Sequence, residues 1–149
     1  MSVEHRKKTP RLPPRWFIRL AWSVHRGVRR IGLWRPRANG WGALRLTTTG
    51  RRTGRQRSVV IGYFEDGPNL VSLAMNGWGE GEPAWWLNLQ TYPDATVDLV
   101  DGRRQVRGHA ATGDERVRLW ARWREIDTNL DDYAALRSSE TAVVVLERL

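Results

Sequence analysis

Residues 44–60 constrain the fold of this chain more than any other segment, because they read as two strands joined by a short basic turn. Apolar and polar residues alternate along 44–49, and the following Gly-Arg-Arg-Thr-Gly carries two glycines that allow a tight reversal. Four arginines crowd this turn: Arg51, Arg52, Arg55 and Arg57. Because guanidinium groups bind phosphate and carboxylate oxygens in pairs, the segment predicts a hairpin with an anion site, with a solvated basic hairpin as the alternative.

The positive charge of the chain is concentrated at its start. The 149 residues carry a formal net charge of +9, but residues 1–37 hold 11 of the 25 Lys and Arg and 1 of the 16 Asp and Glu. The remainder holds 14 basic and 15 acidic residues. A surface that binds nucleic acid as a whole would be basic throughout, so this distribution argues against nucleic acid as a partner. We expect a basic arm over 1–37 and one folded domain over 38–149.

Within the arm, residues 15–34 have helical periodicity. Apolar residues recur at steps of three and four, which predicts an amphipathic helix. Arginines lie on another face, and tryptophans lie at the margins of the apolar stripe. Two interpretations stay open. The stripe packs against the domain or against a second copy in a homodimer, or the helix lies on an anionic membrane surface.

Beyond residue 37 the pattern is typical of a mainly β (α+β) protein. Strands are expected at 41–49, 57–64, 70–75, 95–100, 103–111 and 142–147, and helical segments at 84–90, 114–126 and 133–136. Four residues of the longest helical segment are expected to face inward: Val117, Trp120, Ala121 and Arg124, the last through its stem. Strands of this number with flanking helices fit a small antiparallel barrel.

The residue types present exclude several kinds of site. Cysteine is absent, so the chain has no disulfide, no thiolate metal site and no cysteine nucleophile. Its three histidines are scattered, and no cluster has metal-ligand spacing, so we expect no metal. No apolar run has the length of a membrane span or the form of a signal peptide. We therefore expect a cytoplasmic protein, with a peripheral location at the inner face of the membrane as the alternative that the basic arm suggests.

Three motifs resemble the deazaflavin (coenzyme F420)-dependent nitroreductase family. They are the TTTGRRTGRQR turn, the EPAWWLNL segment with Pro93 after it, and a closing strand near TAVVVLE. The resemblance implies a split β-barrel like that of FMN-binding proteins. It implies coenzyme F420, an 8-hydroxy-5-deazaflavin, as the cofactor in preference to FMN. It also implies an enzyme, a reductase that transfers a hydride from reduced F420 to a quinone, a nitroaromatic compound or a similar electrophile.

The same resemblance implies which residues bind the cofactor. The phosphate and acidic tail would lie on the turn, and the ring on the second strand, a downstream loop and the short helix. The matching positions are Arg51, Arg52, Thr53, Arg57, Ser58, Val59, Val60, Ile61, Ala74, Met75, Asn76, Gly77, Ala84, Trp85, Trp86, Leu87 and Asn88. Core packing is the alternative role for Trp85, and backbone capping is the alternative for Asn88. Tyr133 is the candidate that protonates the product, with solvent as the alternative.

Several positions depart from the pattern of this family, mainly on the substrate side. Met75 and Asn76 stand where the family commonly has a serine followed by lysine or glycine. Glu82 precedes the proline, where histidine or asparagine is common, and Trp86 stands where a tyrosine usually follows the first tryptophan. Asp127 and Leu130 also depart from the family pattern. These departures keep a non-catalytic carrier of deazaflavin, another flavin or a fatty acid open as an alternative function. The arm alone supports a second alternative, a basic peripheral membrane or nucleic-acid-associated module.

Overall fold

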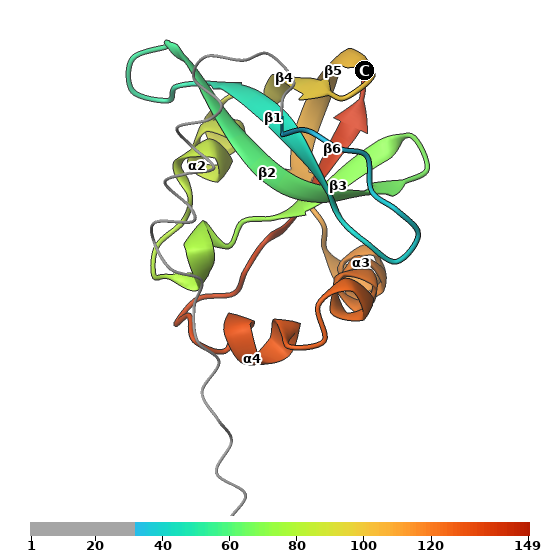
Figure 1. The fold of residues 1–149 in the computed structure, drawn as a ribbon. Coiled ribbons are helices and arrows are strands. Elements are labelled where there is room, and N and C mark those ends of the chain that lie inside the picture. Colours follow the sequence, from blue (N-terminus) through green and yellow to red (C-terminus); the bar gives the residue numbers. More distant parts are fainter. Residues whose placement is uncertain (1–31) are drawn as a thin grey trace, which may run out of the picture.

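Residues 32–149 are described by the computed structural model, and they form a closed six-stranded barrel (Figure 1). The strands follow the order β1-β2-β3-β6-β5-β4 around the barrel, and each neighbouring pair is antiparallel. They are β1 (Gly42–Thr49), β2 (Gln56–Asp66), β3 (Asn69–Leu73), β4 (Asp94–Leu99), β5 (Gly102–Ala110) and β6 (Val143–Arg148). The helical elements are η1 (Asn76–Trp78), α2 (Ala84–Thr91), α3 (Gly113–Ile126) and α4 (Leu130–Ala134). The predicted antiparallel barrel is confirmed.

Two predicted helical boundaries are wrong. The helical turn expected at 133–136 starts earlier, because Leu130 is buried in the outer core and anchors α4 there. The predicted helix over 15–34 lies outside the described residues except at its end. There Trp34 forms an isolated β-bridge with Ala43, so the chain is extended rather than helical at that position.

Strand alternation sends side chains into two separate cores. In β6, Val144 and Leu146 face the inner core of the barrel, whereas Val143 and Val145 belong to an outer core beneath α3 and α4. Both faces of the strand are therefore buried. This explains why β6 reads as a continuous apolar run instead of an alternating one.

Helix α3 covers the outer core with a different stripe from the one predicted. Its buried residues are Leu119, which is 0% exposed, and Trp123, whose ring centroid lies 5.0 Å from that of Phe64 in β2. Of the predicted inward set, Trp120 is confirmed, because it is half-buried and packs against this core. The other three predictions are wrong, since Val117, Ala121 and Arg124 are exposed. Leucine and tryptophan one turn apart bury more apolar area than valine and alanine do, so this pair faces the sheet.

Strand β2 is paired unevenly, and this positions the candidate site. Residues 56–63 pair with β1, but only residues 64–66 pair with β3. Over 56–63 the second edge of β2 therefore has no strand neighbour among the described residues. The β1–β2 turn and α2 lie on one side of the barrel, away from α3, and the loop with η1 lies between α2 and α4 (Figure 1).

The outer core predicts a large stability difference between two positions of α3. Leu119→Ala should lower the free energy of unfolding by about 2–5 kcal/mol, because it leaves a cavity at a fully buried site. Val117→Ala, at a position 69% exposed on the same helix, should change it by less than about 0.5 kcal/mol. Urea denaturation of both variants measures the difference. Similar losses for the two would mean that α3 does not pack as described.

Candidate functional site

The turn between β1 and β2 is held by its own backbone. The Gly50 amide donates to the Arg55 carbonyl over 2.7 Å, and the Gly54 amide donates to the Gly50 carbonyl over 2.8 Å. A Cβ at Gly50 would lie 2.9 Å from the Arg55 oxygen, and Gly54 has a φ of 71°, so both positions require glycine. The Thr53 hydroxyl accepts a hydrogen bond from the Arg55 amide. The tight turn predicted from the two glycines is confirmed.

Arginines at this turn differ from most arginines elsewhere in the described chain. Those with a carboxylate partner are Arg35, Arg103, Arg107, Arg116, Arg118, Arg122, Arg124 and Arg137. At the turn, Arg52, Arg55 and Arg57 are exposed and form no ion pair with a described residue. The sequence has no Asp or Glu over 41–64. Uncompensated positive charge is thus concentrated at one end of β2, where it can attract an anion.

Arg51 is held differently, by a buried amide of α2. The side-chain oxygen Oδ1 of Asn88 accepts hydrogen bonds from the backbone N and from Nη1 of Arg51, each over 3.1 Å. The Asn88 Nδ2 donates to the Thr48 hydroxyl over 3.1 Å, and the Asn88 residue is 3% exposed. Asn88 therefore links the turn, β1 and α2. The alternative predicted for it, backbone capping, is replaced by this link to the turn.

The four predicted residues of β2 do not share one face. Val59 and Ile61 pack against the inner core, whereas the Ser58 hydroxyl lies 2.8 Å from the Thr47 hydroxyl on the outer face. Val60 lies on the same face as Ser58, since side chains alternate along a strand. A ligand along the open edge of β2 would meet the main-chain N–H and C=O groups of alternate residues, because the groups of the other residues point toward β1. Its side-chain contacts would come either from Ser58 and Val60 or from Val59 and Ile61.

The loop after β3 bends through a left-handed segment. Met75 has right-handed helical angles, and the next three residues, Asn76, Gly77 and Trp78, have φ values of 45°, 61° and 63°. Such a change of hand turns successive N–H groups to one side, an arrangement that binds anionic or carbonyl oxygens. No described residue accepts a hydrogen bond from the amides of Asn76 and Gly77. Left-handed angles at non-glycine residues cost about 1–3 kcal/mol each and persist where neighbours enforce them.

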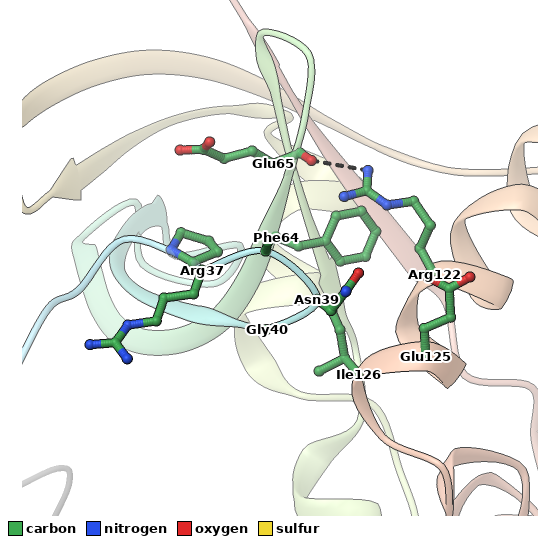
Figure 2. A pocket seen from close by; sticks show the side chains of 10 residues that line it. Arg37, Asn39, Gly40, Phe64, Glu65, Arg122, Glu125 and Ile126 are labelled. Carbon is green, nitrogen blue, oxygen red and sulfur yellow. Dashed lines mark hydrogen bonds between the residues drawn. The ribbon is translucent and has the colours of Figure 1, made fainter.

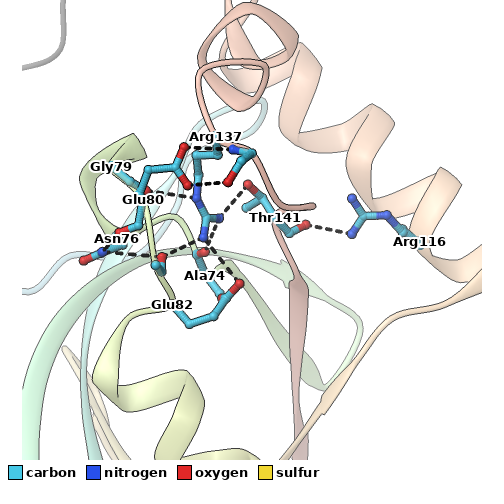
Figure 3. A network of polar contacts seen from close by, with 10 residues as sticks. Ala74, Asn76, Gly79, Glu80, Glu82, Arg116, Arg137 and Thr141 are labelled. Atoms are coloured by element: carbon cyan, nitrogen blue, oxygen red, sulfur yellow. Dashed lines mark hydrogen bonds and ion pairs between the residues drawn. The ribbon is translucent and has the colours of Figure 1, made fainter.

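Arg137, a buried residue that the sequence analysis does not single out, bonds to several parts of this loop (Figure 3). The Arg137 side chain is fully buried, and its guanidinium bonds to main-chain and side-chain oxygens. The acceptors are the carbonyls of Ala74 (2.9 Å), Gly79 (3.1 Å) and Gly81 (2.7 Å), the Thr141 hydroxyl (2.8 Å) and Glu82 Oε1 (3.4 Å). Sequence reasoning misses Arg137 because it stands in a polar segment, Arg-Ser-Ser-Glu, that reads as a solvated loop.

Ser138 adds a second tie to the same loop. Its amide donates to Glu80 Oε1 over 2.9 Å, and its hydroxyl donates to Oε2 over 2.7 Å (Figure 3). These two donors hold the pKa of the Glu80 carboxyl below its usual range, so Glu80 is ionised near neutral pH. Loop 74–82 is thereby joined to residues 137–138 at several points.

Helix α2 presents only part of its predicted contact set. Trp85 and Trp86 are buried in the inner core of the barrel. Ala84 is exposed and Leu87 is half-buried, so their side chains are the accessible ones. The Trp85 ring therefore lies in the core, as the core-packing alternative predicts.

Tyr133 lies beside the loop, against Trp78. The two rings stack with centroids 6.0 Å apart and an angle of 12° between their planes. Trp78 is itself buried in the outer core. The stack places the candidate proton donor next to η1.

A separate pocket of about 210 Å³ lies at the other end of β2 (Figure 2). It is lined by residues 36–40, by Phe64 and Glu65, and by residues of α3. None of the predicted cofactor residues lines it. The Arg122 guanidinium lies 4.1 Å from the Phe64 ring centroid and donates to the Glu65 carbonyl, so its charge already has partners. This pocket is distinct from the surface formed by the turn, the β2 edge and loop 74–82.

The family model and a relative of similar sequence carry the same description. The sequence model of the family described as F420H(2)-dependent quinone reductase matches residues 22–148. An F420H(2)-dependent quinone reductase of Mycobacterium tuberculosis is 30% identical over 139 residues, covering 89% of this chain and 90% of that protein.

Solved structures agree on the fold. A structure described as an F420-H2 dependent reductase has a TM-score of 0.64 at 23% identity, covering 70% of this chain and 93% of that chain. A haem storage protein from Vibrio cholerae has a TM-score of 0.51 at 12% identity, covering 72% and 81%. At these identities the likeness concerns the fold alone, and that fold is the split β-barrel.

The buried link between α2 and the turn predicts a stability effect. Asn88→Ala should lower the free energy of unfolding by about 1–3 kcal/mol, because it leaves the Arg51 amide and the buried Thr48 hydroxyl without partners. Gln90→Ala, at an exposed position of the same helix, should change it by less than about 0.5 kcal/mol. Thermal and urea denaturation measure both. An Asn88→Ala protein as stable as the wild type would contradict the link.

Proposed function

The chain belongs to the F420H(2)-dependent quinone reductase family, and we propose that its own reaction takes place along the open edge of β2. The family that the motifs indicate is confirmed, and with it an oxidoreductase that uses coenzyme F420. Family membership favours the reductase over the carrier and the basic module. We place the site there because the arginine cluster at the end of that edge has no carboxylate partner among the described residues.

The turn fits the anionic part of the cofactor. Arg52 and Arg57 are exposed, have no described carboxylate partner and stand on the two sides of one turn. Arg51 is already oriented by Asn88 and keeps further N–H donors for a ligand. We assign the phosphate and acidic tail to these three arginines and to Thr53. Preorganised donors bind with less loss of entropy than mobile ones.

The ring is assigned to the β2 edge, to loop 74–77 and to the exposed side of α2. When bound, the reduced deazaflavin supplies the hydride that the quinone accepts. The loop amides of Asn76 and Gly77 can hold carbonyl oxygens of the ring, and Ala84 and Leu87 add apolar contact that excludes water. The chain thereby fixes the distance and angle between donor and acceptor, which is its main contribution to rate.

The acceptor also needs one proton to become a hydroquinone. Tyr133 is the proposed donor, because its stack on Trp78 places it beside η1, the element that follows the ring-binding loop. Solvent is the other source.

The arm is proposed to bring the enzyme to its lipophilic substrate. Residues 15–34 combine an apolar stripe, border tryptophans and arginines, a composition suited to an anionic membrane surface. Within residues 32–149 no helix is long and apolar enough to cross a membrane. A second copy of the chain is the other proposed partner of this stripe. One similar solved structure, 23% identical, is described as a domain-swapped dimer.

The arginine turn can be tested with a shortened cofactor. Arg52→Ala or Arg57→Ala should weaken F420 binding by about 1.5–3 kcal/mol, the range for a charge-assisted hydrogen bond. A deazaflavin without phosphate and tail should bind equally well to wild type and variants. Fluorescence titration measures each affinity, with Arg148→Ala, an exposed arginine of β6, as the control. Equal losses for the full and shortened cofactor would assign these arginines to the fold.

Membrane association is tested on the full chain by charge reversal. Wild-type protein should sediment with vesicles rich in anionic lipid at low salt and dissociate as salt rises. Arg19→Glu combined with Arg26→Glu should abolish sedimentation, since each basic residue near such a surface contributes about 1 kcal/mol. Arg104→Glu with Arg148→Glu, on the barrel, is the matched control. Wild-type protein that ignores these vesicles would rule out the membrane proposal and leave the cofactor site unaffected.

A further inference from the structure

The loop that presents its amides at η1 is shaped by residues that lie far away in the sequence. Arg137 bonds to the carbonyls of Ala74, Gly79 and Gly81, which stand at both ends of the left-handed segment 76–78. Ser138 holds the Glu80 carboxylate between them. Figure 3 shows these contacts converging on the loop from one side.

Arginine suits this task for a geometric reason. Its guanidinium is a rigid planar fork, so bonds from Nε, Nη1 and Nη2 fix the directions of three carbonyls at once. Its charge also compensates Glu82, whose Oε1 lies 3.4 Å from Nη2 and whose Oε2 is buried without a partner among the described residues. A lysine would keep the charge beside Glu82 and lose the fork.

The strain in the loop points to function. Asn76 and Trp78 hold positive φ values although neither is glycine, and such angles persist where the surroundings enforce them. Here the Asn76 side-chain amide donates across the loop to the carbonyls of Glu80 and Gly81, and Arg137 and Ser138 hold that same stretch in place. Neither side chain needs to touch a ligand, because each acts through the main chain of the loop.

We propose that Arg137, supported by Ser138, is the positioning residue that holds loop 74–82 in the shape that binds the deazaflavin ring. The inference rests on the proposed function, which places the ring on this loop. It assigns a role to a residue outside the turn, the β2 edge and α2. Loss of the fork should loosen the loop, weaken binding of reduced F420 and leave the affinity for the quinone unchanged.

The variants are chosen to separate positioning from general stability. Arg137→Lys keeps the buried charge and removes the fork, and Ser138→Ala removes one hydroxyl from an exposed position. Arg107→Lys is the control, because it removes the same kind of fork from a surface pair with Asp94. Hydrogen exchange of residues 74–82 is followed without ligand. KM for reduced F420, KM for a quinone and kcat are then measured at steady state.

Both site variants should exchange faster than wild type over 74–82, and both should raise KM for reduced F420. For Arg137→Lys the increase in KM should be about tenfold, the effect of losing one charge-assisted hydrogen bond. KM for the quinone should stay unchanged, and the control should match wild type throughout. The proposal would be overturned if residues 74–82 of Arg137→Lys exchanged at the wild-type rate, or if its KM for reduced F420 were unchanged. If Arg137→Lys does not fold, Ser138→Ala decides in the same way. Absence of F420 binding by wild type would contradict the proposed function itself, and the exchange rates would still show whether these residues order the loop.

Discussion

The uneven pairing of β2 is the constraint on which the candidate site depends. A strand that is paired on one side keeps main-chain donors and acceptors along its other edge, and these must find water, another chain or a ligand. In this barrel the free length of β2 runs from the arginine turn toward the point where β3 joins. The charged turn lies at one end of this edge, and we propose that the left-handed loop and the accessible side of α2 border it. A ligand placed there would meet backbone, charge and apolar surface together.

Buried polar side chains set the two borders of that place. On one side Asn88 fixes the arginine turn against β1 and α2, and on the other Arg137 fixes loop 74–82. Each is deeply buried and each bonds to main-chain groups from a different part of the chain. A buried polar group is costly unless it is fully hydrogen-bonded, so these contacts define one conformation of the border rather than several. A preformed surface of this kind suits a reaction in which the protein mainly orients donor and acceptor.

The sequence predicts those features that leave a local pattern. Glycines and arginines at 50–57 indicate the turn and its charge, and the apolar run at 142–147 indicates a mostly buried strand. Partners far apart in the sequence leave no such pattern. Arg137 lies 63 residues from Ala74, and Asn88 lies 37 residues from Arg51, so neither contact can be read from spacing. The stripe of α3 is mispredicted for a related reason: two apolar stripes compete on that helix, and the outer core selects the one with Leu119 and Trp123.

Hydrogen exchange of the full-length protein with and without F420 tests the location of the site most directly. Bound cofactor should slow exchange along residues 51–61, 74–77 and 84–88, because these segments form the turn, the free edge of β2, the loop and the start of α2. Residues 36–40 and 122–126, which line the separate pocket, should exchange at the same rate in both states. Slower exchange confined to that pocket, or no change anywhere, would contradict the account.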